Sequence, residues 1–93
     1  LLNFYNDFLR TTQEGVNELT EAQAANNADD IGAIAHRLKS SARAVGAHAL
    51  ADGCLNLEEA GKCSDWPTIE REMSALPGKF EAVSLWIEKR NTA

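Results

Sequence analysis

The sequence predicts an all-α protein, folded as an antiparallel up-down-up-down four-helix bundle with its last helix kinked near Pro77. The chain has 93 residues, which is enough for one core but not for two, so residues 1–93 are expected to form a single domain. Hydrophobic residues make up 44%, and there are only two prolines and six glycines, too few for a many-turned sandwich or a disordered chain. Four segments also repeat apolar residues at helical spacing.

The first helix is expected over residues 2–25. Its apolar stripe follows spacings of three and four residues: Tyr5, Phe8, Leu9, Thr12, Val16, Leu19 and Gln23. Gly15 lowers the helix propensity by about 1 kcal/mol relative to alanine. In the connection that follows, Asn27 is expected to cap the second helix, because its side chain can accept from free amides, while Asp30 favours the first turn.

The second helix is expected to end at about Val45 and the third to run from Ala47 to about Ala60. Gly46 separates them, because glycine tolerates the left-handed conformation that ends many helices. The second helix has a narrow apolar arc: Ile31, Ala35, Leu38, Ala42 and Val45. The buried side of the third is marked by Leu50, Cys54 and Leu57, and the GKCSD stretch is expected to form the next turn.

The last helix is expected from Trp66 to Lys89. One apolar stripe runs along it: Ile69, Met73, Leu76, Phe80, Val83 and Ile87. Pro77 and Gly78 interrupt this stripe, and an internal proline costs about 3 kcal/mol. Because the stripe keeps its phase across them, one kinked helix is favoured over two. Trp66 and Trp86 are expected to be packing anchors.

Charge is unevenly distributed along the chain. The 14 acidic and 9 basic side chains give a net charge of −5, which disfavours nucleic acid or an anionic membrane as partner. Between Ile31 and Ala51 there is no Asp or Glu, yet Arg37, Lys39 and Arg43 lie there. One segment is therefore locally basic on an acidic chain.

Several classes of site and location are disfavoured by the sequence. Cys54 and Cys63 are too few and too far from a histidine for a zinc site, and both are expected to be reduced thiols. No Glu stands three residues before either histidine, as a di-iron bundle requires. No stretch approaches the ~20 apolar residues of a membrane span. The chain starts without Met inside a predicted helix, so it is expected to be part of a longer protein.

His36 is the candidate functional residue. On a helical wheel it lies roughly 150° from the centre of the apolar arc, so its ring is expected to face water. Its surface neighbours at spacings of three, four and seven are small or cationic: Gly32, Ala33, Lys39, Ser40 and Arg43. Short side chains would give another domain access to the ring, and Gly32 is expected to sacrifice helix propensity for this. Four of these residues are expected to contact the partner: Gly32, Ala33, Ser40 and Arg43.

The cations suit phosphoryl chemistry. An imidazole is a nucleophile only when neutral, and cations within one helical turn disfavour the protonated form. After phosphorylation, Lys39 can pair with the phosphoryl oxygens. Arg37 is expected on the outer face without a role, and His48 is expected to be solvated. Arg43 is equally consistent with a helix-dipole contact and a docking contact.

At these residues the sequence resembles the histidine-containing phosphotransfer domains of bacterial multistep phosphorelays. The signature of that family is a helix with A-H-x-L-K-G, a small-residue stretch, and G-A before the next helix. Here residues 35–40 read AHRLKS, followed by SA at 41–42 and GA at 46–47. Residues 50–61 resemble the family's third helix, with matching positions at Leu50, Cys54, Leu57 and Glu58. The likeness covers about residues 4–87.

The resemblance implies that His36 is the phosphorylated residue and Lys39 its electrostatic partner. It also implies that the partners are receiver domains, whose phosphoaspartate and Mg²⁺ supply the catalytic machinery, so that the chain needs no metal or cofactor of its own. Ser40 departs from the family's commoner Gly. It leaves room and can bond back to the His36 carbonyl or to a phosphoryl oxygen, so transfer is expected to survive while the choice of partner differs.

The favoured function is a phosphoryl carrier that accepts the group from one receiver domain and passes it to another. No Gly-rich nucleotide loop is present, so ATP-dependent kinase activity is not expected. Arg37 and Ser40 break the H-E/D-x-x-T/N pattern of kinase dimerisation domains. The alternative is a non-catalytic helical adaptor that docks a partner through the basic face around His36. A cytoplasmic monomer is expected, either alone or as the C-terminal part of a membrane-bound hybrid sensor kinase.

Overall fold

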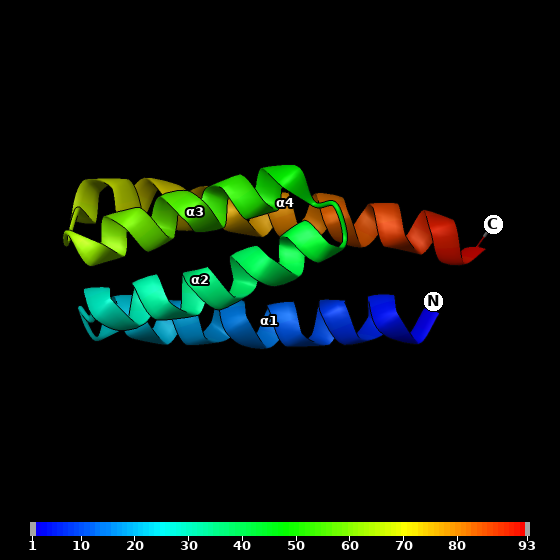
Figure 1. Ribbon diagram of the computed structural model, residues 1–93, viewed down its shortest axis with the longest axis horizontal. Coiled ribbons are helices and arrows are strands. Elements are labelled where there is room, and N and C mark those ends of the chain that lie inside the picture. Colours follow the sequence, from blue (N-terminus) through cyan, green and yellow to red (C-terminus); the bar gives the residue numbers. More distant parts are fainter. Residues whose placement is uncertain (1, 93) are drawn as a thin grey trace.

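Within residues 2–92, the computed structural model of the chain has four α-helices and no strand. The structure describes the backbone of these residues and the side chains of residues 3–90. The helices are α1 Leu2–Ala24, α2 Ala28–Ala44, α3 His48–Lys62 and α4 Trp66–Thr92. Successive helices run in opposite directions, and both termini lie at the same end (Figure 1). The predicted fold class, a four-helix bundle, is confirmed.

The core lies on the faces that helical periodicity predicted. The largest fully buried side chains come from all four stripes: Thr12, Leu19, Ile31, Leu50, Cys54, Leu57, Ile69, Leu76 and Ile87. Burying one Leu or Ile side chain stabilises a fold by about 1.5–3 kcal/mol, so these residues supply much of the driving force for assembly. The predicted positions that are only half-buried lie at the margins of the same faces: Tyr5, Leu9, Val16, Val45, Met73, Phe80 and Val83.

The first two turns follow the predicted chemistry. Asn27 is the N-cap of α2, and its Oδ1 accepts a hydrogen bond from the backbone amide of Asp30 at 3.1 Å. The capped amide would otherwise lack a partner in the first helical turn. Gly46 has a φ of 77°, the left-handed conformation expected where α2 ends.

The third turn differs from the prediction. Helix α3 continues through Gly61 to Lys62, so only the last part of the GKCSD stretch forms the turn. Ser64 has a φ of 53°, and Asp65 accepts hydrogen bonds from the amide and hydroxyl of Thr68 at 3.3 and 2.7 Å. These bonds lower the pKa of Asp65. Gly61, the glycine of this stretch, lies buried inside the helix and does not end it, because it packs against the backbone of α2.

Helix α4 is a single helix through Pro77, as favoured over two separate helices. Both Pro77 and Gly78 are exposed, so the proline ring disturbs the outer side of the helix and leaves the apolar stripe in phase. The kink at this position stays a prediction.

The two tryptophans differ in their packing. Trp66 is half-buried and packs against the core, as predicted. Trp86 is 42% exposed, so it packs at the margin of the bundle and not in the core. Its ring meets the ring of Tyr5 edge-on at 5.8 Å, and the Arg90 guanidinium lies 4.3 Å from the ring centre. Trp86 thus joins the terminal segments of α1 and α4, which extend beyond the α2–α3 turn (Figure 1).

Both cysteines are free thiols, Cys54 buried and Cys63 exposed. Burial raises the pKa of Cys54 to about 11, in keeping with its predicted place as a core residue. None of the four helices, over the part of the chain described, is long and apolar enough to cross a membrane. Within the same residues, no group of three His, Cys, Asp or Glu side chains is placed to hold a metal ion.

Candidate functional site

His36 projects from α2 on the side away from the core. Its side chain is 63% exposed, whereas Ala35 and Leu38 on the same helix are 0% and 5% exposed. The predicted exposure is therefore confirmed. It follows from the helical phase alone, because the apolar arc has to face the bundle and His36 lies opposite that arc.

Glu58 of α3 is the residue of this site that the sequence analysis did not identify as functional. Its side chain is only 8% exposed, and its Oε2 lies 2.8 Å from Nδ1 of His36. A signal was present in the sequence. Glu58 follows Leu57 and stands four residues after Cys54, within the buried face of the third helix, where a carboxylate requires polar partners.

Lys39 supplies the main partner of this carboxylate. Its Nζ lies 2.5 Å from Oε1 of Glu58, and its side chain is 12% exposed. The expectation of a surface cation beside the ring is corrected here: the lysine stem lies along the bundle and the ammonium is bound to a buried carboxylate. The nearest charge to His36 is thus the carboxylate of Glu58 from the neighbouring helix.

The protonation pattern of the site follows from the state of Glu58. The hydrogen bond from Lys39 lowers the pKa of Glu58 to about 2, against the effect of burial and with a further contribution from His36. An ionised carboxylate can only accept hydrogen bonds. Nδ1 of His36 must therefore donate to Glu58, and the neutral ring has its lone pair on Nε2. Nε2 is the nitrogen available as a nucleophile.

A shallow hollow of about 360 Å³ lies beside the ring. The residues that line it come from α2 and α3: Asp29, Gly32, Ala33, His36, Glu58 and Lys62. Of the predicted docking positions, the structure brings Gly32 and Ala33 to the hollow. Ser40 and Arg43 lie farther along α2, outside it.

The access to the ring expected from Gly32 stays a prediction, since Gly32 lines the hollow and also lies at the contact between α2 and α3. Gly32 is buried, and a Cβ placed on it would lie 3.4 Å from the backbone oxygen of Glu58. Gly61 of α3 faces it, and a Cβ there would lie 2.7 Å from the Gly32 nitrogen. The absence of a side chain at Gly61 therefore allows α2 and α3 to approach closely, and this contact brings Glu58 within reach of His36.

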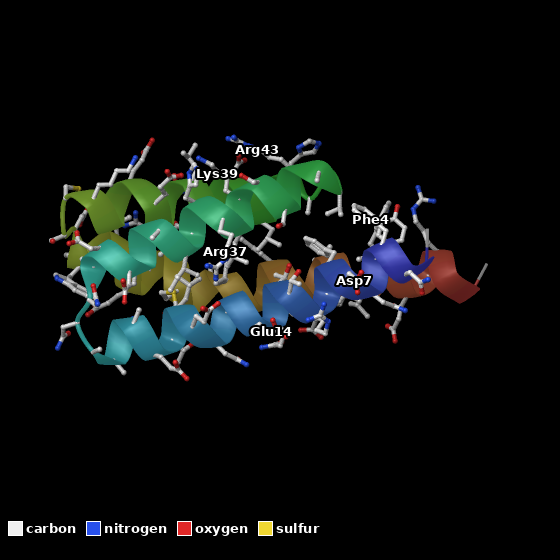
Figure 2. The ribbon with its side chains drawn as sticks, turned by 60° about the horizontal axis from the view of Figure 1, so that its bottom comes forward. Phe4, Asp7, Glu14, Arg37, Lys39 and Arg43 are labelled. Atoms are coloured by element: carbon white, nitrogen blue, oxygen red, sulfur yellow. The ribbon has the colours of Figure 1, made fainter. Side chains whose placement is uncertain are left out.

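The remaining candidates keep the positions expected of them. Ser40 is exposed, and its hydroxyl donates a long hydrogen bond of 3.4 Å to the His36 carbonyl. Arg37 pairs with Glu18 of α1 at 2.6 Å, on the side of α2 opposite Lys39 (Figure 2). Arg43 is exposed in the last turn of α2, which leaves both of its interpretations open. His48 is exposed at the start of α3, as predicted.

The stability of this site is expected to depend on pH through Glu58. Its pKa lies at about 2 in the folded protein against an ordinary value of 4.5, so its stabilising effect is present above the ordinary value and is lost as pH falls toward the lower one. In urea unfolding, Glu58→Gln is expected to be less stable than the parent at neutral pH, and the difference should shrink on acidification over this window. Glu59→Gln, which removes an exposed carboxylate from the same helix, is the control. A difference independent of pH would contradict this role of the Glu58 charge.

Comparisons with known proteins agree with this fold. A family model described as Hpt domain matches residues 3–86. The structure is similar to the crystal structure of histidine-containing phosphotransfer protein B (HptB) from Pseudomonas aeruginosa PAO1, with a TM-score of 0.95, 21% sequence identity, and coverage of 98% of this chain and 79% of that one. At this identity the likeness shows the fold. No curated protein sequence matches the chain.

Proposed function

Because the chain belongs to the Hpt domain family, phosphotransfer carriers that interact with receiver domains in phosphorelays, we propose that His36 accepts a phosphoryl group from a receiver aspartate and passes it to a second receiver. One observation supports this assignment above the others. His36 is 63% exposed, and its Nδ1 is held 2.8 Å from the ionised Glu58 carboxylate. The ring is thus accessible and oriented, with Nε2 as the nucleophile.

The transfer step requires no external base, because the attacking nitrogen of the neutral ring carries no proton. The lone pair of Nε2 attacks the phosphorus of the aspartyl phosphate, so that a nitrogen–phosphorus bond forms as the bond to the aspartate oxygen breaks. The electron pair of the broken bond leaves with the aspartate carboxylate. Nδ1 keeps its proton, and the positive ring that results is paired with the carboxylate of Glu58. Transfer to the second receiver is the same step in reverse.

The other residues of the site position the reacting ring. Glu58 sets the tautomer, and Lys39 holds the charge and orientation of Glu58 from inside the bundle. The receiver, with its own Mg²⁺, is proposed to neutralise the phosphoryl group during transfer, and this chain contributes no metal ligand. One His36 in each bundle is sufficient, so we propose that the domain acts as a monomer. Ala33, Ser40 and Arg43 are exposed on α2 and are proposed to touch the receiver.

The proposal is tested by incubating the protein with a phosphorylated receiver domain and mapping the transferred label. We expect label on His36 that is lost in acid, because phosphoramidates are acid-labile. The helical adaptor, which binds the same face without chemistry, would bind the receiver and take no label. Absence of label on the parent protein with several phosphorylated receivers would therefore overturn the carrier function.

A positioning role for Glu58 predicts slower transfer without loss of the acceptor. Glu58→Gln keeps an oxygen that accepts from Nδ1 but loses the charge that pairs with Lys39 and with the positive ring. We expect the rate of label transfer to fall about tenfold, which corresponds to the loss of one charge-assisted hydrogen bond, while the label stays on His36. Rapid-quench measurement over a range of receiver concentrations separates the transfer rate from binding. An unchanged maximal rate would remove Glu58 from the mechanism.

A further inference from the structure

The hollow beside His36 lies toward the N-terminal end of α2. Side chains of an α-helix tilt toward its N-terminus, so the ring of His36 leans over Gly32 and Ala33 and away from Lys39. The residues around the hollow agree with this direction, because Gly32 and Ala33 line it and Lys39 does not. A phosphoryl group bound to Nε2 would thus extend over this hollow, which Lys39 does not line.

Lys62 is the cation that α3 brings to this hollow. The glycine contact between α2 and α3 involves Gly61, and Lys62 follows it directly in the last turn of α3. Its Nζ lies 3.5 Å from Oε2 of Glu58, the same oxygen that contacts Nδ1 of His36. The ammonium group is therefore close to the reacting ring although the two residues are distant in sequence.

The two lysines differ in how firmly they are held. Lys39 is 12% exposed and contacts Glu58 at 2.5 Å, whereas Lys62 is 72% exposed and contacts it at 3.5 Å. Withdrawing Lys39 would leave a buried carboxylate without its main partner, which is costly. The long contact of an exposed lysine is weak, and its flexible stem can turn toward a new anion. Lys62 is free to move where Lys39 is not.

We propose that Lys62, and not Lys39, pairs with the phosphoryl oxygens on phosphorylated His36. The inference rests on the proposed carrier function and changes the expected identity of the electrostatic partner. Lys39 continues to neutralise Glu58 in both states, while the Lys62 ammonium moves from Glu58 to the phosphoryl group. Asp29 also lines the hollow and opposes a second anion there, which increases the need for a cation at this position.

The test uses the parent protein and the variants Lys62→Ala, Lys62→Arg and Lys39→Ala, each phosphorylated with the small molecule phosphoramidate so that receiver docking plays no part. The phosphohistidine lifetime and the pH titration of its ³¹P resonance are measured, with folding checked by circular dichroism. Arg71→Ala, which removes an exposed cation from α4, is the control. A merely structural or helix-dipole role of Lys62 would leave the ³¹P titration unchanged.

In Lys62→Ala we expect the ³¹P titration midpoint to rise and the phosphohistidine lifetime to fall by about three- to tenfold, the loss of one exposed charge-assisted contact. Lys62→Arg should restore both values, and Lys39→Ala should raise the midpoint less than Lys62→Ala does, because Lys39 acts only through Glu58. Parent values in Lys62→Ala, or a raised midpoint in Lys39→Ala alone, would overturn the inference while leaving the carrier function intact. If the parent protein is not phosphorylated on His36, both the inference about Lys62 and the carrier function are overturned.

Discussion

Replacement of His36 by glutamine is expected to abolish phosphoryl acceptance while helix content stays unchanged. Glutamine has no nucleophilic nitrogen, because the lone pair of an amide nitrogen is delocalised into the carbonyl group. The His36 side chain is 63% exposed, so the substitution removes no core contact, and the glutamine amide can still donate to Glu58. Transfer from a radiolabelled receiver, followed by acid treatment, measures the acceptance, and far-ultraviolet circular dichroism measures the helix content.

His48→Gln is the matched control for this experiment. His48 is the other histidine of the chain, it is exposed at the start of α3, and it does not line the hollow at His36. This variant should take label at the parent rate. Acid-labile label that persists in His36→Gln, or that disappears in His48→Gln, would show that the acceptor has been assigned to the wrong residue.

Replacement of Gly61 by alanine is expected to lower the free energy of unfolding by about 3 kcal/mol, near the upper end for overpacking. The added Cβ would lie 2.7 Å from the oxygen of Ala28 and 2.7 Å from the nitrogen of Gly32. These are backbone atoms, so no rotamer change relieves the clash, and α2 and α3 have to move apart. The free-energy cost of this clash exceeds the gain of about 1 kcal/mol that alanine brings to a helix interior relative to glycine. Urea unfolding followed by circular dichroism measures the difference.

Gly78→Ala separates the effect of packing from that of helix propensity. A Cβ at Gly78 meets no atom within 4 Å, so this variant should be as stable as the parent or more stable, by up to about 1 kcal/mol. Because the contact at Gly61 also holds α3 against α2, Gly61→Ala should slow phosphoryl transfer by displacing Glu58 from His36. Equal stability of Gly61→Ala and the parent would mean that the close approach of the two helices is not required.

The sequence by itself determined the features that belong to one helix at a time. Periodicity predicted the number and extents of the helices, and the chemistry of short segments predicted the Asn27 cap and the left-handed Gly46. The exposure of His36 is of the same kind, because the direction of a side chain follows from its angle to the apolar arc of its own helix. Each of these predictions involves residues within a few turns of one another, where helix geometry leaves little freedom.

Only the tertiary structure decided which groups surround the ring of His36. Glu58 is 22 positions away in sequence, and its contact with His36 depends on the offset and separation of α2 and α3. That separation depends on Gly61, which locally resembles a helix stop but has no room for a Cβ against the backbone of α2. The same pairing directs Lys39 to Glu58 and brings Lys62 to the hollow. Periodicity indicates which face of a helix is buried. It does not indicate which residue of a neighbouring helix lies opposite, because that registry depends on the side-chain volumes of both helices.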